Sequence, residues 1–194
     1  LLAQGATVSW ARDSFTLDGQ VHPIGVMLVE NIERHIVDQI AADLHLDLMA
    51  TELLLPADVT SIPIRQPRLA VYEPWGGNMD AGWTRWVLEQ HEFPYTLLRS
   101  ADIQKPKLRD NFDVIILPDA STVDLLRGLR SRNVRPEYRG GIGVQGIQTL
   151  RRFVSQGGTL ITLGNSVSFA IQHLAAPLLN VIEDQSADTF YAPG

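Results

Sequence analysis

The sequence contains no cysteine, which excludes disulfide bonds, thiolate metal sites and cysteine nucleophiles together. The redox compartment stays open, because cytosolic and exported proteins alike can lack cysteine. No apolar run approaches the roughly 20 residues that a membrane-spanning helix needs. Basic residues are fewer than acidic ones, 16 against 22, and the net charge of −6 repels phosphate backbones. We therefore expect neither a membrane span nor a nucleic-acid partner.

The ends of the chain also lack familiar features. It opens with "LLAQGATVSW", without an initiator methionine or a signal peptide, and closes with "TFYAPG", without a helical or charged tail. Such ends are typical of a piece cut from a longer polypeptide. If so, we expect that residues outside this chain also contribute to the activity of the whole protein.

The composition that is present is that of an ordinary soluble domain. The chain has 194 residues, of which 45% are hydrophobic and 20% charged. This is enough for one domain with a sizeable core and a small appendage. The pattern changes near residue 66, so we predict an N-terminal appendage with a connector over residues 1–65 and an α/β domain over residues 66–194.

The appendage is predicted to combine a hairpin, a strand and a helix. Asp18-Gly19 between two short apolar segments is a strong signal for a two-residue hairpin turn. "GVMLVE" (25–30) reads as a short buried strand. Apolar residues at every fourth position predict an amphipathic helix within residues 31–48, capped by Asn31. Three prolines within residues 53–68 indicate a connector.

From residue 68 onward strands and helices alternate, which calls for right-handed crossovers and a mainly parallel sheet. The third strand is apolar almost throughout, as expected for a parallel strand covered on both faces. The predicted strands are 68–72, 94–98, 112–119 and 159–163, with a further edge strand at 180–183, and the predicted helices are 80–91, 143–156 and 166–175.

In open parallel sheets, ligands bind outside the carboxyl ends of the strands, so the residues that follow each strand are the candidates for a site. A further loop, "RPEYRGGIG" (135–143), places polar side chains just before a helix. The candidate ligand-binding residues are Glu73, Trp75, Asn78, Asp119, Glu137, Arg139, Asn165 and Ser166, which we expect to converge on one rim.

The loop after the first strand, "EPWGGNMDAG", is not a phosphate loop. It has neither the G-x-G-x-x-G nor the G-x-x-x-x-G-K-[ST] spacing, it has no lysine, and Glu73 and Asp80 would repel phosphate. Asp80 is expected to cap the following helix, whereas Glu73 has no evident structural role. Trp75 lies in the loop itself, where it either packs or forms a lip over a pocket. No cofactor is predicted.

Ser166 is the candidate nucleophile. A strand, a sharp turn and a helix resemble the arrangement of a nucleophile elbow, but "GNSVS" lacks the second glycine of G-x-S-x-G. A serine nucleophile also needs a histidine base. His173 lies about two turns farther along the same helix and would point away. Capping of the helix explains Ser166 more simply.

Two further patterns have simple structural explanations. His35 and Asp38 are the closest approach to a metal-ligand pair, and solvation of a helix surface accounts for them, so no metal site is expected. Trp83 and Trp86 are spaced along one helix, and aromatic residues at such spacing usually pack inside. We therefore expect at least one of these two rings in the core.

Three strings, "YEPWGGNMDAGWTRWVLEQHEFPYTLLRSADI", "FDVIILPD" and "PEYRGGIGVQGIQTLRRFVSQGGTLITL", resemble a region that follows the catalytic domain in bacterial zinc carboxypeptidase-like proteins. The resemblance covers residues 20–194. It implies a three-layer, flavodoxin-like domain of the class I glutamine amidotransferase type, a peptidase domain as partner in the same polypeptide, and a periplasmic or secreted location. The cysteine and histidine of amidotransferases have no counterpart at Gly164-Asn165-Ser166 or after it, so glutamine hydrolysis is not expected.

Three hypotheses for function follow. The first, which we favour, is a non-catalytic accessory domain that packs against the peptidase domain or presents substrate to it. The second is a serine hydrolase that uses Ser166 with Glu73, Asp119 or Glu137 as a helper. The third is a pocket for a small molecule or peptide, in which the guanidinium of Arg139 grips a carboxylate.

Overall fold

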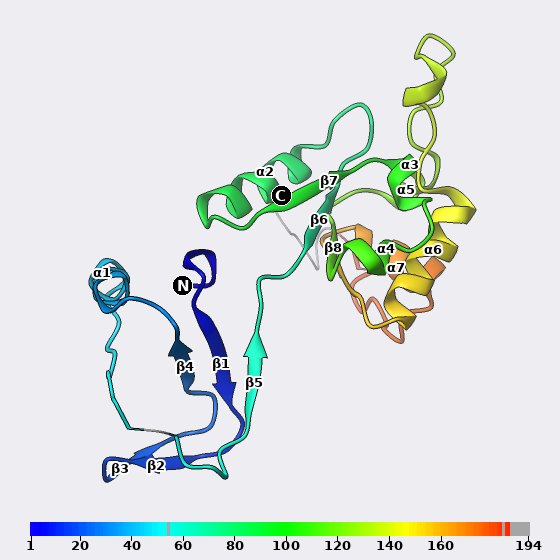
Figure 1. Ribbon diagram of the computed structural model, residues 1–194. Helices are drawn as coiled ribbons and strands as arrows, with labels where there is room; N and C mark the ends of the chain where they lie inside the picture. The colour runs from blue at the N-terminus through cyan, green and yellow to red at the C-terminus, as the bar shows by residue number, and fades with distance from the viewer. Residues whose placement is uncertain (54, 184, 187–194) are drawn as a thin grey trace. The chain divides into compact units, whose positions relative to one another are not determined.

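The computed structural model describes residues 1–53, 55–183 and 185–186. The chain divides into two compact units, Leu1–Gln66 and Pro67–Gly194 (Figure 1). Each unit has its own sheet and its own cluster of buried side chains.

The first unit is built on a three-stranded antiparallel sheet and a separate hairpin. The middle strand of the sheet is flanked by the other two on either side, in the order β4-β1-β5. The elements are a short 3-10 helix (Leu2–Gln4), β1 (Thr7–Ala11), β2 (Phe15–Leu17), β3 (Gln20–His22), β4 (Met27–Glu30), α1 (Arg34–Leu44) and β5 (Ser61–Ile64).

The predicted hairpin is confirmed. β2 and β3 pair antiparallel, and Asp18 and Gly19 between them have φ values of 49° and 74°. Positive φ at both central residues is what a type I′ turn requires, and its twist matches that of the flanking strands. Phe15 and Leu17 of β2 are buried with Ala11 in the small core of this unit.

The start of α1 and the connector differ from the prediction. Asn31 does not cap the helix, because its side chain donates instead to Thr7 Oγ1 at 3.1 Å, and α1 begins only after Glu33. The connector contains β5, in which Pro63 lies opposite Ser9. A proline has no N–H to donate, and an inner strand needs its N–H groups because it pairs with a neighbour on each side. β5 is an edge strand of its sheet, where a proline is tolerated.

The second unit contains a four-stranded sheet that is parallel throughout, in the order β7-β6-β8-β9 (Figure 1). Its strands are β6 (Leu69–Tyr72), β7 (Tyr95–Leu98), β8 (Val114–Leu117) and β9 (Thr159–Thr162), and each lies where the sequence predicts one. The further edge strand predicted at 180–183 is wrong, because residues 181–183 form a turn. β9 therefore forms one edge of the sheet in the described part of the chain.

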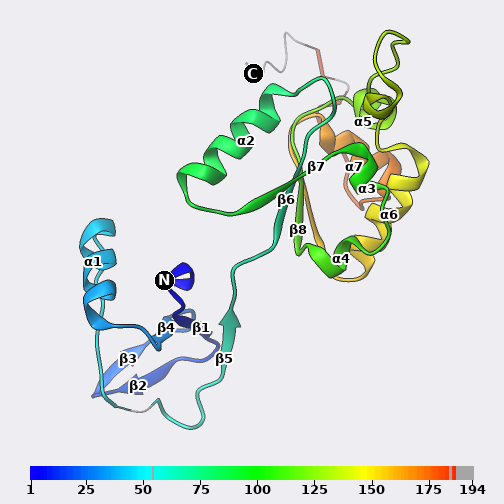
Figure 2. The same cartoon turned by 45° about the horizontal axis from the view of Figure 1, so that its top comes forward.

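Helices cover both faces of this sheet, so the unit is a mixed α/β fold compatible with three layers. One helix, α2 (Met79–Gln90), lies on one face, and the others lie on the opposite face (Figure 2). The helices of the second group are α3 (Ser100–Ile103), α4 (Leu108–Asn111), α5 (Thr122–Arg127), α6 (Gly143–Ser155) and α7 (Ser166–Leu174), with a 3-10 turn, η2 (Pro136–Tyr138), between α5 and α6.

The main core lies between the sheet and the helix group α3–α7. Alternate residues of the strands face it, since successive side chains of a strand point to opposite faces. Fully buried members include Tyr72 of β6, Ile115 and Leu117 of β8, and Leu150 and Phe153 of α6. Burial of such apolar side chains contributes about 1.5–3 kcal/mol each to folding.

The opposite face of the sheet is covered unevenly. Val71 of β6 lies under α2 and is fully buried, whereas the side chain of Ile161 in β9 is 39% exposed and that of Leu163, just beyond the strand, is 40% exposed. The main contact of α2 with the sheet is to β6. The end of the sheet at β9 thus presents apolar side chains to solvent.

The expectation that Trp83 or Trp86 lies in the core is wrong. Their exposed fractions are 59% and 50%, and their rings meet edge to face, with centroids 5.7 Å apart. The fully buried residue of α2 is Ala81, whose small side chain lets the helix approach the sheet. The two indoles lie on the outer side of the helix as a result.

We predict that Leu150→Ala lowers the free energy of unfolding by about 2–5 kcal/mol, because it removes a fully buried side chain from the main core. Val144→Ala, on the same helix at a position that is 72% exposed, is the control and should change stability by less than about 0.5 kcal/mol. Urea unfolding followed by circular dichroism measures both. Equal losses for the two variants would contradict the placement of α6.

Candidate functional site

Except for Glu137 and Arg139, the residues that the sequence singles out lie in the loops after β6, β8 and β9 or at the start of α7, at the carboxyl ends of the strands. Between β6 and β8 the direction of strand addition reverses, and such a switch point is where parallel sheets commonly hold ligands. The loops on the two sides of this point are joined by side-chain hydrogen bonds. Each candidate residue therefore has to be judged by what it already contacts.

Asn78 joins the first two loops. Its Oδ1 accepts the backbone N–H of Ala81 at 2.8 Å, which caps α2, and its Nδ2 donates to the carbonyl of Asp119 at 2.8 Å. The helix cap is thus Asn78 and not Asp80, contrary to the prediction. Asp80 lies in the first turn of α2, where a negative charge is favourable near the helix N-terminus.

Asp119 joins the loop after β8 to the loop after β9. Its Oδ1 accepts the backbone N–H of Asn165 at 2.8 Å. Gly164 has a φ of +53°, and a Cβ at this position would collide with the Asp119 carboxylate. Only glycine allows this approach, so the turn before α7 is shaped around Asp119.

Ser166 is fully buried and both of its hydrogen-bonding functions are engaged. Its Oγ donates to the carbonyl of Pro118 at 2.5 Å and accepts the backbone N–H of Ala120 at 3.2 Å. The predicted capping role is wrong, because Asn165 precedes α7 and makes no side-chain cap. The hydroxyl instead fixes the loop after β8 against the start of α7.

Among the described residues, no base stands beside Ser166. Its hydrogen-bond partners in the described chain are backbone groups, and the ring of His173 packs against Phe169 with a centroid distance of 5.5 Å. A serine nucleophile needs a general base within hydrogen-bond reach of Oγ. The arrangement supplies a structural bridge and not a proton relay.

Glu73 has the structural role that the sequence did not reveal. Its carboxylate accepts a hydrogen bond from Arg85 Nη1 at 3.0 Å and lies 3.8 Å from Arg99 Nη2, and its side chain is only 12% exposed. Arg85 also donates to the hydroxyl of Tyr95, which raises the pKa of the guanidinium, with smaller contributions from Glu73. These bonds tie the end of β6 to α2 and β7.

Trp75 packs within the protein. The guanidinium of Arg99 lies over its ring at 4.4 Å from the centroid, and the ring of Tyr138 meets it edge to face at 4.7 Å. Arg99 Nη1 also donates to the carbonyls of Glu73 and Pro74, each at 3.0 Å. The stack therefore holds the loop after β6 against η2 and leaves Trp75 half-buried.

The side chain of Tyr72, just before Glu73, is uncharged and lies in the interior. Its phenol is buried, and burial raises its pKa, although the hydrogen bond with Ser100 and the charge of Arg99 oppose the rise. The two hydroxyl oxygens lie 3.0 Å apart. A phenol that stays protonated at neutral pH supports the structure here and does not act as a base.

Glu137 and Arg139 lie apart from the other candidates. Arg139 donates to the carbonyls of Arg132 at 2.7 Å and Val134 at 2.6 Å, and Glu137 is exposed, 4.0 Å from Arg135. The structure therefore joins Asn78, Asp119, Asn165 and Ser166 into one bonded cluster, places Glu73 and Trp75 in a second, and leaves this pair in a loop of its own. The sequence predicted a single rim.

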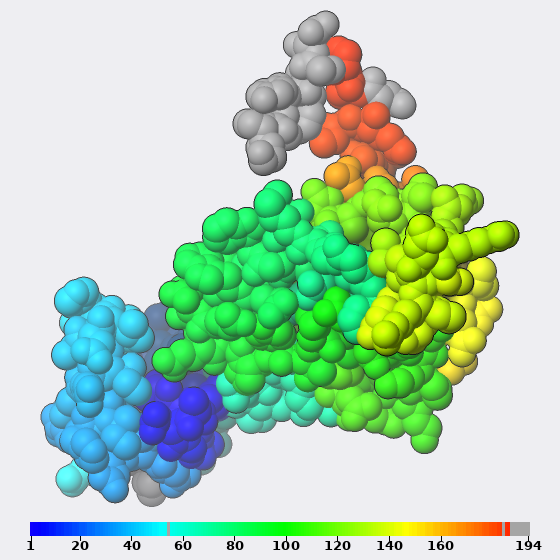
Figure 3. Space-filling view, turned by 90° about the horizontal axis from the view of Figure 1, so that it is seen from above, coloured from blue at the N-terminus to red at the C-terminus, as the bar shows by residue number. Residues whose placement is uncertain are grey.

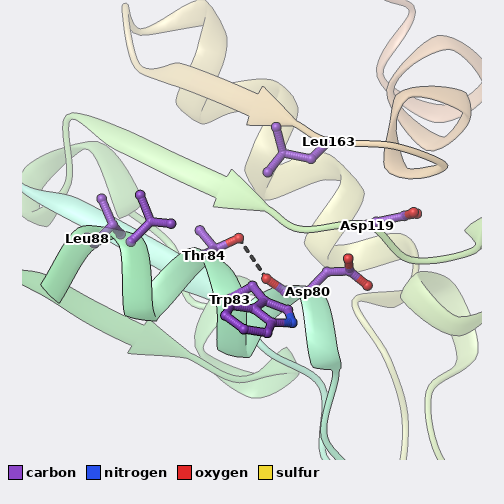
Figure 4. A pocket seen from close by; sticks show the side chains of 7 residues that line it. Asp80, Trp83, Thr84, Leu88, Asp119 and Leu163 are labelled. Carbon is purple, nitrogen blue, oxygen red and sulfur yellow. Dashed lines mark hydrogen bonds between the residues drawn. The ribbon is translucent and has the colours of Figure 1, made fainter. Parts of the chain in front are cut away.

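A groove of about 350 Å³ opens between α2 and the ends of β8 and β9 (Figure 4). Leu163 points from the end of β9 toward α2, and Asp119 stands beside it on the loop after β8. Most of the exposed lining is apolar. The residues that line the groove are Asp80, Trp83, Thr84, Val87, Leu88, Asp119 and Leu163.

The sequence did not identify this groove, although it contains a signal for it. Trp83 and Val87 are four residues apart and so share one side of α2. Such spacing by itself predicts packing in the core. What the sequence could not show is that Ala81, rather than a large residue, meets the sheet, which leaves the apolar side of the helix open.

The described residues contain no group of three or more histidine, aspartate or glutamate side chains arranged to hold a metal ion. None of the described helices has the length and apolar character to span a membrane. Comparisons of the chain with protein-family models, with curated proteins and with solved structures gave no match.

We predict that Asn78→Ala lowers the free energy of unfolding by about 1–2 kcal/mol, since it removes a helix cap and the bond to the Asp119 carbonyl. Asn165→Ala is the matched control, because Asn165 also precedes a helix but contributes only its backbone N–H to Asp119, which alanine retains. Its effect should stay within a few tenths of a kcal/mol. Urea titrations of both variants measure these changes. A larger loss of unfolding free energy in Asn165→Ala than in Asn78→Ala would contradict these roles.

Proposed function

We propose that this chain is a non-catalytic accessory region of a larger zinc carboxypeptidase-like protein, and that its second unit is a flavodoxin-like domain related to class I glutamine amidotransferases. The strand order supports the topology. Numbered along the unit, the four parallel strands stand in the order 2-1-3-4, which is the flavodoxin-like order without its fifth strand. The assignment to a zinc carboxypeptidase-like protein is based on the resemblance of residues 20–194 to the region after the catalytic domain in such proteins.

The observation that carries the proposal is the state of the polar groups at the carboxyl edge of the sheet. Asn78, Asp119 and Ser166 each bond to the backbone of another loop, and Glu73 is bonded to arginine. An enzyme keeps its nucleophile and base oriented toward substrate. Here the corresponding groups face one another and hold the loops together.

The position equivalent to the amidotransferase nucleophile supports the same conclusion. It corresponds to Gly164-Asn165-Ser166, which has a serine in place of cysteine, and that serine is fully buried. Acyl transfer requires an accessible nucleophile and a neighbouring base. A fold that is kept without its reactive residues suits a domain that binds or supports a partner.

The surface offered to the partner is the groove together with the outer side of α2. Trp83, Trp86 and Val87 are all about half exposed or more, and Leu163 adds to them from the sheet. Clustered apolar side chains in solvent commonly mark an interaction site. The proposed occupant is the peptidase domain of the same polypeptide, in a periplasmic or secreted protein.

A peptide or small-molecule pocket is a second candidate, and the groove favours it. A volume of about 350 Å³ lies within the range of small-ligand sites, and two carboxylates, Asp80 and Asp119, stand at an otherwise apolar lining. The predicted grip of Arg139 on a carboxylate has no support, because that guanidinium is bonded to backbone carbonyls. A ligand of this groove would be apolar with a cationic group.

We predict that Val87→Glu in the full-length polypeptide weakens docking of the peptidase domain by about 1–3 kcal/mol, because it places a charge in an apolar contact. Calorimetry should then show a lower melting temperature for the peptidase domain. Val123→Glu is the matched control, since Val123 is 55% exposed on α5 and Val87 is 48% exposed on α2, and only Val87 lines the groove. Identical unfolding of the wild type and both variants would contradict the accessory role.

A further inference from the structure

Five of the chain's fourteen arginines fall within "RGLRSRNVRPEYR", residues 127–139, which contain a single acidic residue, Glu137. We call this segment the arginine loop. All five arginines are exposed. The yellow-green loop stands out from the surface of its unit in Figure 3. This concentration of positive charge contrasts with the net negative charge of the whole chain.

The two ends of the arginine loop are in backbone contact. Leu129 and Gly140 form an antiparallel bridge, in which Gly140 N–H donates to the Leu129 carbonyl at 2.8 Å. Gly128 has a φ of +50°, and a Cβ there would collide with the Gly140 carbonyl, so only glycine permits this approach. A surface loop with closed ends and internal packing is an Ω-loop, a type that is frequently functional.

The loop is held in shape by its own residues. Arg139 clamps the carbonyls of Arg132 and Val134, and the ring of Tyr138 packs on Trp75. One arginine is therefore used as a scaffold. A loop that its own contacts hold in one shape loses less conformational entropy when it binds.

Three of the other four arginines have no carboxylate partner among the described residues. Arg127, Arg130 and Arg132 form no ion pair with any described carboxylate, and Arg135 lies 4.0 Å from Glu137. Like charges crowded on one loop repel one another, and an anion bound among them would relieve that repulsion. The arrangement is thus suited to a ligand with several negative charges.

We propose that the arginine loop is the docking site for a carboxylate-rich segment of a partner protein. The planar guanidinium fork of arginine pairs with carboxylate through two parallel hydrogen bonds. Several forks on a rigid loop would recognise a short run of aspartate and glutamate side chains. This surface is separate from the groove along α2, so the inference stands apart from the proposed function.

Two other anionic partners fit the loop less well. A nucleic acid would extend past the loop onto a chain that is acidic elsewhere, and the one aromatic ring of the loop, Tyr138, packs on Trp75 instead of offering a stacking platform. A membrane surface would need an exposed apolar anchor, whereas Leu129 and Val134 are half-buried.

The test measures binding of a short fluorescent glutamate-rich peptide to the intact chain by anisotropy. Arg130→Gln with Arg132→Gln should weaken binding about tenfold or more, and added salt should weaken it further. The control double variant, Arg12→Gln with Arg152→Gln, removes two exposed arginines elsewhere and should bind as the wild type does. Circular dichroism confirms that both variants fold.

Three results would overturn the proposal. They are no measurable binding of the peptide, an equal loss in both double variants, and tighter binding of a single-stranded oligonucleotide or of anionic phospholipid vesicles than of the peptide. The groove variant Val87→Glu should leave peptide binding unchanged, and that result separates this inference from the docking of the peptidase domain.

Discussion

The hydroxyl of Ser166 is the contact on which the carboxyl edge of the sheet depends. It bridges the carbonyl of Pro118 and the N–H of Ala120 from the first residue of α7, and so fixes the loop after β8. That loop then presents the carbonyl of Asp119 to Asn78 and its carboxylate to Asn165. The hydrogen bonds of a buried hydroxyl offset its desolvation penalty, whereas an unpaired one would cost about 1–3 kcal/mol.

Two neighbouring surfaces of the second unit therefore differ in character. At the switch point Asn78, Asp119 and Ser166 bond to backbone groups of neighbouring loops, and Asp119 also lines the groove. Beside it, α2 approaches the sheet through Ala81 and leaves Trp83 and Val87 outside, above a groove that ends at Leu163. The proposed accessory role assigns these bonded groups to support of the loops, and the exposed apolar surface next to them to association.

The sequence predicted the strands of the second unit well, because short apolar runs bounded by turn residues leave few other choices. The Asp18-Gly19 hairpin followed from the same logic. The helix caps were predicted less well. Asn78, Asp80, Asn165 and Ser166 are all good capping residues by type, and only tertiary contacts decide which of them caps a helix and which bonds to a neighbouring loop.

The candidate site was predicted in part. The sequence brought Asn78, Asp119, Asn165 and Ser166 to one edge correctly, because all four follow parallel strands that end on the same side. Glu73 acquired its role from Arg85 and Arg99, which lie far from it in sequence, and Trp75 acquired its place from Arg99 and Tyr138. The groove and the arginine loop depend on the rotation of α2 about its axis and on the contact between the two ends of the loop, and an apolar pattern determines neither of these.

The central claim is that Ser166 supports the structure and does no chemistry. Labelling of the folded protein with a fluorophosphonate probe, followed by peptide mass spectrometry, tests it most directly, with an active serine hydrolase labelled in parallel. The account predicts no adduct on Ser166, because its hydroxyl is buried and its hydrogen-bond partners in the described chain are backbone groups. An adduct on Ser166 that heat denaturation abolishes would contradict it.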